Sequence, residues 1–427
     1  MNPFAIATKG KGFKKALRRA QVITSRYGLT STRMDDTLTR FARLLDSYTA
    51  PATFPITAVA LQRNGVTVRR LAQQGIEFAI HGHTHIDHSR LTTADQIARL
   101  NQATAIFQAG QVPFRGFRCP YLRWNEATLA ALRHHHFLYD SSQGLAWDVL
   151  DGLETPAYRR VLDFYGAQPA QQYPALPRLE QGLLRIPYCL PDDEGLIDRL
   201  QLPPAARTEV WLKMLQQIYD LGELFTVGLH PERFDLLAEP LAATLAQART
   251  LAPAVWIARL DEIAAWWCNR TETNVILTVL PSQEAVQVTV AGPAGLTILA
   301  RRLTVNGPTA PWAGAYERVL VENFTLATSL RPVIGLSPHS APSLHEFLRQ
   351  QGYVIELNDD SRPYPFYLDR PDFAPEDERP LLTQIESGDW PLLRLGRWPD
   401  GARAALNVTG DIDALTLWDY GLRFLGN

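Results

Sequence analysis

The chain has 427 residues, of which 46% are hydrophobic and 20% are charged, and its formal net charge is −2. This length exceeds that of one ordinary domain, and the composition is typical of a soluble globular protein. The near-neutral charge gives no electrostatic basis for a nucleic-acid partner. No transmembrane segment and no apolar leader are recognisable, so we expect a cytoplasmic protein. The three cysteines lie far apart, which favours neither a disulfide framework nor a cysteine-rich metal site.

Short apolar runs alternate with helical patterns through most of residues 1–270. The first strand-like run is 51–59, and a helix over 66–75 leads to a second strand over 76–82. Further helices are expected over 92–110, 125–136 and 207–220, and further strands over 114–121, 137–142, 183–190, 224–230 and 254–259. Alternating strands and helices predict a parallel sheet with helical cover, here a (β/α) barrel over residues 1–270. Polar residues collect just after the strand ends, which is where such barrels carry their chemistry.

The residue pattern of the sequence changes after about residue 270. Residues 274–330 contain β-branched, alternating runs separated by Gly, Pro and Asn, which predict a small antiparallel β module. Residues 333–400 begin with a strand–helix–strand pattern and are expected to form an α/β connecting segment. Residues 401–427 read as an apolar strand followed by a helix, and we expect this C-terminal part to join the barrel.

The segment HGHTH, which follows an apolar run, contains two histidines four residues apart, His81 and His85. This spacing places two imidazoles on one side of a helical or tightly turned backbone, and neutral histidine is the usual nitrogen ligand of zinc. A third, anionic ligand is needed to complete such a site. His83 and His88 lie in the same segment and are expected to point elsewhere.

Two more strand ends carry residues suited to catalysis. Arg118 ends a strand and precedes Cys-Pro-Tyr, where its guanidinium can orient a carboxylate and keep it ionised. His230 ends another strand and is a candidate general acid. Asp140 follows a further strand and is expected to support Arg118, whereas Asp192 and Asp193 are candidates to line a polar sugar site.

Taken in chain order, PATFPITA, HGHTH, FRCPYLRWN and GLHP resemble the motifs of NodB-type polysaccharide deacetylases, which are the carbohydrate esterases of family four. The likeness covers roughly residues 30–265. One departure is Gly82, which stands where the family usually has Ser or Thr. The resemblance implies a distorted (β/α) barrel that holds a divalent metal through one Asp and two His.

The resemblance also implies roles for individual residues. His81 and His85 correspond to the metal ligands, and Arg118 corresponds to the residue that orients the catalytic Asp. His230 corresponds to the general acid, and the backbone N–H of Tyr121 would help to stabilise the oxyanion.

The acidic residues of the site have two candidate locations. The family opens with a strand ending in Thr-Phe-Asp-Asp, but the acids nearest to that place, Asp35 and Asp36, begin an amphipathic helix, where they favour the helix dipole. The C-terminal strand instead ends in Thr-Gly-Asp-Ile-Asp, similar to a Thr-His-Asp-Val-Asp variant of the opening motif. We therefore predict a circularly permuted barrel, with the last strand beside the 51–59 strand, Asp411 as the base and Asp413 as the third ligand. The rival assignment keeps Asp35 and Asp36 in these roles.

Together these features predict a metal-dependent hydrolase that removes N-acetyl groups from amino sugars of a polysaccharide or glycan precursor. Two His and one Asp suit zinc, and cobalt, nickel or iron fit the same ligands. The altered acidic motif favours an alternative, an inactive carbohydrate-binding relative that has lost the metal. A third hypothesis is a hydrolase of small amides on the same scaffold. The sequence does not reveal the glycan or the oligomeric state.

Overall fold

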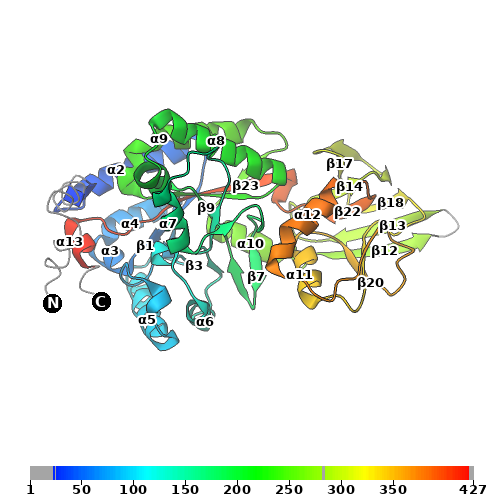
Figure 1. Cartoon of the computed structure of the whole chain (residues 1–427), viewed down its shortest axis with the longest axis horizontal. Coiled ribbons are helices and arrows are strands. Elements are labelled where there is room, and N and C mark those ends of the chain that lie inside the picture. The colour runs from blue at the N-terminus through cyan, green and yellow to red at the C-terminus, as the bar shows by residue number, and fades with distance from the viewer. Residues whose placement is uncertain (1–22, 25, 281–283, 423–427) are drawn as a thin grey trace.

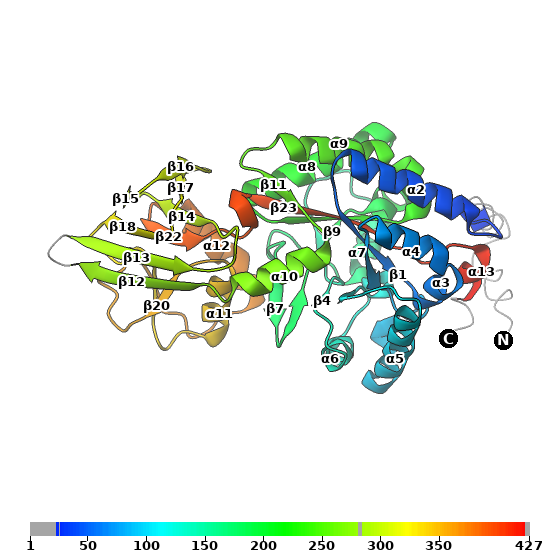
Figure 2. The ribbon, with the colours of Figure 1, turned by 180° about the vertical axis from the view of Figure 1, so that it is seen from behind.

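The computed structural model describes residues 23–24, 26–280 and 284–422. The two ends of the chain, 1–22 and 423–427, therefore lie outside the described residues. They belong to the ranges 1–270 and 401–427, which were expected to form the barrel. The described part forms two lobes that lie side by side (Figures 1 and 2). The larger lobe contains the helices and strands of the alternating region up to residue 270, together with the C-terminal strand. The smaller lobe contains most of residues 274–400.

The larger lobe is built around a curled sheet of nine strands, of the type expected for a distorted (β/α) barrel. Its order is β10-β23-β1-β2-β3-β4-β8-β7, and β11 pairs with β23. Every pairing in it is parallel apart from that of β7 with β8. The strands are β1 (Ala52–Ile56), β2 (Glu77–Ile80), β3 (Gly116–Phe117), β4 (Tyr139–Asp140), β7 (Arg178–Glu180), β8 (Leu183–Arg185), β10 (Leu224–Leu229), β11 (Val255–Ile257) and β23 (Ala404–Gly410). A small second sheet joins β5 (Gly144–Ala146), β6 (Gln168–Pro169) and β9 (Tyr188–Leu190).

Helices cover the outside of this sheet (Figure 1). They are α2 (Thr32–Ser47), α3 (Ala58–Arg63), α4 (Gly65–Gln73), α5 (Thr93–Ala109), α6 (Glu126–His134), α7 (Pro156–Tyr165), α8 (Pro204–Leu221), α9 (Ala238–Thr250) and α10 (Leu260–Arg270). Local signals fix several of their ends: the Thr92 hydroxyl accepts a hydrogen bond from the Asp95 N–H, and Gly222 ends α8 with φ 69°. Phe54 of β1 packs on Phe41 of α2, so alternate strand residues face the helices. None of the helices in the described ranges is both long and apolar enough to cross a membrane.

The last strand lies within the barrel sheet. Strand β23 lies between β10 and β1 and runs parallel to both. Its seven residues are all buried, which suits a strand with neighbours on each side. After the strand, the Ile412 N–H donates to the Pro55 carbonyl across 2.7 Å. Helix α13 (Leu417–Leu422) then returns to the N-terminal part of the chain, where the Leu417 N–H donates to the Gly28 carbonyl.

The smaller lobe contains a β sandwich. One sheet has the order β12-β13-β18-β15 and the other the order β16-β17-β14-β22. The strands are β12 (Asn274–Leu280), β13 (Ala285–Ala291), β14 (Ile298–Arg301), β15 (Thr304–Asn306), β16 (Thr309–Pro311), β17 (Tyr316–Val319), β18 (Asn323–Ala327) and β22 (Leu392–Leu395). Apolar residues of both inner faces, such as Val288 and Leu393, form one buried cluster. Strand β22 comes from the expected connecting segment 333–400 and reaches back into the sandwich.

The remainder of residues 333–400 forms a small α/β unit. Its parallel sheet has the order β20-β19-β21, and two helices accompany it. The elements are β19 (Ile334–Leu336), α11 (Pro342–Gln350), β20 (Ile355–Leu357), β21 (Phe366–Leu368) and α12 (Glu378–Ser387).

The smaller lobe docks at the N-terminal edge of the barrel strands. Glu223, which directly precedes β10, forms an ion pair with Arg379 of α12. The Trp398 indole donates to the Gly222 carbonyl across 3.1 Å, and the Trp266 indole of α10 donates to the Arg397 carbonyl across 2.8 Å. The lobe therefore lies at the opposite end of the barrel from the C-terminal ends of the strands (Figure 2).

Candidate active site

The candidate site residues lie at the carboxyl ends of four strands. His81 directly follows β2, Arg118 follows β3, His230 follows β10, and Asp411 follows β23. Parallel strands end at one edge of a sheet, so the topology brings residues from distant parts of the chain together. A cavity of about 760 Å³ lies over this edge, and these residues help to line it, Arg118 excepted because it is buried beneath.

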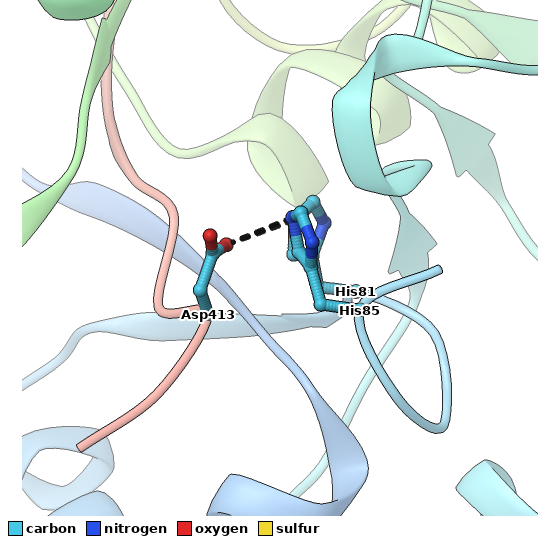
Figure 3. Close-up of side chains that lie close together, drawn as sticks. All are labelled: His81, His85 and Asp413. Carbon is cyan, nitrogen blue, oxygen red and sulfur yellow. Dashed lines mark ion pairs between the residues drawn. The ribbon is translucent and has the colours of Figure 1, made fainter. Parts of the chain in front are cut away.

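His81, His85 and Asp413 converge on one point (Figure 3). The Asp413 Oδ1 lies 3.5 Å from the His81 Nε2 and 3.2 Å from the His85 Nε2. All three ligand atoms lie within 4.8 Å of one another. Two imidazole nitrogens and one carboxylate oxygen at such separations can bind one divalent ion.

The hydrogen bond of His81 supports its assignment as a metal ligand. Its Nδ1 lies 2.9 Å from the Arg118 carbonyl oxygen, which can only accept, so Nδ1 carries the proton. The lone pair is therefore on Nε2, the atom that faces Asp413. Histidines that bind metals usually donate their other ring N–H in this way, which fixes the tautomer and the ring orientation. The donor set thus fits zinc, and also cobalt, nickel or iron.

The backbone of the HGHTH segment explains the departure at Gly82. Its φ is +79°, a conformation that residues with a side chain rarely adopt. A Cβ at this position would also lie 3.1 Å from the His88 Nε2 and 3.1 Å from the Thr84 carbonyl. His88 is buried with its Nδ1 3.3 Å from the Gln96 Oε1, so it stands outside the metal cluster. His83 is also outside the cluster.

Arg118 is held rigidly and orients Asp411. Its Nη1 donates to the Asp411 Oδ1 across 2.7 Å and to the Thr409 hydroxyl across 2.8 Å. Its Nε and Nη2 donate to the carbonyl and hydroxyl of Ser141, each across 2.9 Å, and its guanidinium stacks over the Tyr188 ring. Arg118 is fully buried. The pair is charge-assisted and holds the Asp411 carboxylate in one orientation.

The expected support of Arg118 by Asp140 is wrong. Asp140 accepts from the Arg185 Nε across 2.8 Å and from the Ser142 hydroxyl. The neighbouring Ser141 supports Arg118 instead. Adjacent residues at a strand end point to different sides of the sheet, which is why a shift of one position changes the partner.

His230 is supported by Asp193. The Asp193 carboxylate accepts from the His230 Nδ1 across 2.9 Å and from the His230 backbone N–H across 2.8 Å. Burial alone would lower the pKa of His230, but the charge of Asp193 beside it raises that pKa well above its ordinary value. The Nδ1 is thus committed, and the Nε2 is the atom left to deliver a proton.

Sequence reasoning placed Asp193 near a sugar and missed its contact with His230. The motif PDDE contains two adjacent acids, and no local pattern in the sequence indicates which of them contacts His230. The structure separates them: the neighbouring Asp192 accepts from the Tyr188 hydroxyl across 3.0 Å and from the Gly195 N–H across 2.8 Å. Burial, with the charge of Asp193, raises the pKa of Asp192 to about 7.

Tyr121 lies beside the metal cluster. It sits in a short 3-10 turn, Pro120–Leu122, with φ 59°, a strained conformation for a residue with a side chain. Its ring makes an edge contact with the His85 ring at a centroid distance of 4.2 Å. The turn thus brings the backbone of Tyr121 to the rim of the cavity.

Asp35 and Asp36 do not reach this site. Both lie in α2, Asp35 in its first turn, and Asp35 accepts from the Arg70 guanidinium across 2.8 Å. Asp36 is exposed. Among the residues that the structure describes, the acid that joins His81 and His85 is Asp413.

Comparison with known proteins finds a similarity to one family. Residues 27–139, which carry strands β1 to β4 and both histidines of the cluster, match the family model for polysaccharide deacetylase. No curated protein matches the sequence.

Two solved structures are similar to the chain over about half of its length. A probable polysaccharide deacetylase from Pseudomonas aeruginosa PAO1 has 21% identity and a TM-score of 0.43, covering 54% of this chain and 72% of its own. Puue allantoinase has 19% identity and a TM-score of 0.44, again covering 54% of this chain and 72% of its own.

Proposed function

We propose that the protein is a metal-dependent hydrolase that removes N-acetyl groups from amino sugars of a polysaccharide or glycan precursor. The observation that carries this proposal is the convergence of His81, His85 and Asp413 beside the Arg118–Asp411 pair. The match of residues 27–139 to the polysaccharide deacetylase family model supports the reaction class. A carbohydrate is accordingly the proposed substrate.

His81, His85 and Asp413 would hold the metal, with zinc as the first choice. A divalent ion supplies two effects when bound: it lowers the pKa of a water molecule and polarises the amide carbonyl. Asp413 is two residues from Asp411 in the chain, so a metal held by Asp413 would be next to the proposed base.

The remaining steps belong to the side chains and backbone of the cavity. Asp411, oriented by Arg118, accepts a proton from the water that attacks the acetyl carbon. The backbone N–H of Tyr121 stabilises the oxyanion of the tetrahedral intermediate. The C–N bond then breaks, and His230 gives its Nε2 proton to the leaving amine while Asp193 holds its Nδ1. The products are acetate and a free amino sugar.

We also propose that the barrel is circularly permuted relative to the family's usual strand order. The segment directly after β23 supplies Asp411 and Asp413 from the C-terminal part of the chain, and β23 lies beside β1. The contact of the Leu417 N–H with the Gly28 carbonyl brings the two chain regions that a permutation would join close together.

The test combines metal content with turnover. The full chain is loaded with zinc or cobalt, its metal content is measured by elemental analysis, and acetate release is followed from N-acetylglucosamine oligosaccharides. We expect one metal ion per chain and metal-dependent acetate release. Metal binding without release from any acetylated sugar would favour a small-amide hydrolase. A chain that binds no metal would favour the inactive carbohydrate-binding relative.

A further inference from the structure

A second cavity lies between the barrel and the smaller lobe, at the opposite end of the barrel from the proposed active site. Its volume is about 380 Å³. Six arginines line it: Arg301, Arg302, Arg379, Arg394, Arg397 and Arg403. They come from strands β14 and β22 of the sandwich, from helix α12, and from the segment that leads into β23.

Four of these arginines are buried, namely Arg301, Arg379, Arg394 and Arg397, and none of the four is more than 8% exposed. Removing a cation from water is expensive unless a nearby anion compensates it. The carboxylates around the cavity therefore decide whether this charge is balanced. There are four of them: Asp220, Glu223, Glu386 and Asp389.

Three of the carboxylates do little for the other three buried cations, Arg301, Arg394 and Arg397. Glu223 is committed to Arg379, which binds both of its oxygens. Asp389 is exposed and pairs with the exposed Arg302. Asp220 is also exposed, and its carboxylate accepts from a glutamine of its own helix.

Only Glu386 then remains for Arg301 and Arg394. It forms an ion pair with the Arg394 Nη1 at 2.5 Å and lies 3.8 Å from the Arg301 Nη1. The other Arg301 hydrogen bonds go to carbonyl oxygens, such as that of Trp390 at 3.0 Å. Two buried guanidinium groups thus share a single carboxylate.

Arg397 has no carboxylate within ion-pair distance among the described residues. Its Nη1 donates to the Leu221 and Gly222 carbonyls across 3.0 and 3.4 Å, at the C-terminus of α8. A helix terminus carries only about half of an elementary charge, so it compensates the cation in part. Burial and the charge of Arg394 lower the pKa of Arg397. Just behind it, burial and the charges of Arg397 and Arg394 lower the pKa of Arg270 to about 9.

We propose that this cavity binds a phosphate group. Two buried guanidinium groups share one carboxylate and a third, that of Arg397, has none, which leaves positive charge that an oxyanion would neutralise. Guanidinium forks match the geometry of phosphate oxygens, and the hydroxyls of Thr383 and Ser387 on α12 add polar groups at the wall. The cavity admits a phosphate together with a small organic group. The ligand is therefore inorganic phosphate or a phosphate monoester such as a sugar phosphate.

The test is calorimetric titration of the full chain with inorganic phosphate and, separately, with glucose 6-phosphate, at constant ionic strength. We expect at least one of them to bind and to raise the Tm. Binding of glucose 6-phosphate alone identifies a monoester site, whereas equal binding of both identifies the free ion as sufficient. The Arg397→Met variant should bind at least tenfold more weakly. The matched control Arg159→Met removes an exposed, distant arginine and should bind as wild type does.

A second variant guards against misfolding. Thr383→Asp supplies a carboxylate at the cavity wall, so it should abolish phosphate binding and raise the Tm measured without phosphate. The proposal is overturned if neither probe binds to wild type, or if Arg397→Met and Thr383→Asp both bind as tightly as wild type. These readouts do not depend on metal binding or deacetylation.

Discussion

The Arg118 guanidinium donates to the Asp411 carboxylate across 2.7 Å, although 293 positions separate the two residues in the chain. The contact exists because β3 and β23 end at the same edge of the barrel sheet. Asp413 lies two residues beyond Asp411 and turns toward His81 and His85 instead. One short segment thus contributes two carboxylates with different partners, a cation for the first and two imidazoles for the second.

These different partners predict different losses for two matched substitutions. Asp413→Asn should weaken metal binding at least 100-fold, because an amide oxygen replaces the only anionic ligand. Asp411→Asn should retain the metal but lower kcat by roughly 10²–10⁴-fold, the usual contribution of a general base. Elemental analysis and acetate release measure the two effects.

The control for this pair is Asp36→Asn, which changes an exposed carboxylate on α2 and should alter neither quantity. Loss of metal in Asp36→Asn would return the acidic role to the N-terminal pair. Full activity of the Asp411→Asn variant would exclude Asp411 as the base.

The contact of His230 with Asp193 predicts a shifted pH profile. His230 must be protonated to serve as the acid, so kcat/KM should fall as the pH rises through its pKa. Asp193 raises that pKa, and Asp193→Asn should therefore move the alkaline fall to lower pH by about one unit or more. The measurement is kcat/KM from pH 5 to 10.

A suitable control for this profile is Asp198→Asn, since Asp198 borders the same cavity but pairs with Arg233 instead of His230. Its alkaline limb should stay where the wild type has it. An unchanged limb in Asp193→Asn would show that His230 is not the titrating acid.

Local spacing in the sequence was enough to place the histidines of the site. The four-residue interval of His81 and His85, and the acids at the end of the 401–410 strand, are short-range patterns tied to strand ends. The alternation of strands and helices likewise indicated the barrel. These features depend on periodicity and on the position of a residue relative to its own strand.

Partner choice across the fold could not be predicted in the same way. Whether Asp140 or Ser141 supports Arg118 depends on which side of the sheet each faces, and short strands such as β4 show no alternation long enough to tell. The pairing of β22 with β14 in the sandwich joins segments far apart in the chain. No local pattern encodes such a pairing.

The backbone at Gly82 predicts a specific cost for adding a side chain. Gly82→Ala should lower the free energy of unfolding by about 1–2 kcal/mol for the left-handed conformation, with an added loss from the close His88 and Thr84 atoms. Gly152→Ala is the matched control: its φ is +85°, and nothing lies near its Cβ position. The excess loss in Gly82→Ala, measured by urea unfolding, reports the local crowding. Equal losses in both variants would show that the HGHTH loop relaxes freely.

The buried carboxyl of Glu77 predicts a pH dependence of stability that is separate from catalysis. Burial, with the charge of Asp261, raises its pKa from 4.5 to about 7, although the Thr53 and Tyr139 hydroxyls donate to it. The folded protein therefore holds a proton that the unfolded chain releases above about pH 4.5. Stability attributable to Glu77 must fall as the pH rises from 4.5 to 7 and level off above that range.

Glu77→Gln removes this titration while keeping the shape of the side chain. Relative to wild type, the variant should gain about 3 kcal/mol of unfolding free energy between pH 4.5 and pH 8, since one pKa unit corresponds to about 1.4 kcal/mol. Urea unfolding at the two pH values measures the difference, and Glu239→Gln, an exposed change on α9, should show none. If Glu77→Gln kept the pH slope of the wild type, the carboxyl would have to be ionised in the folded barrel. The hydroxyls of Thr53 and Tyr139 would then be strong enough to offset its burial.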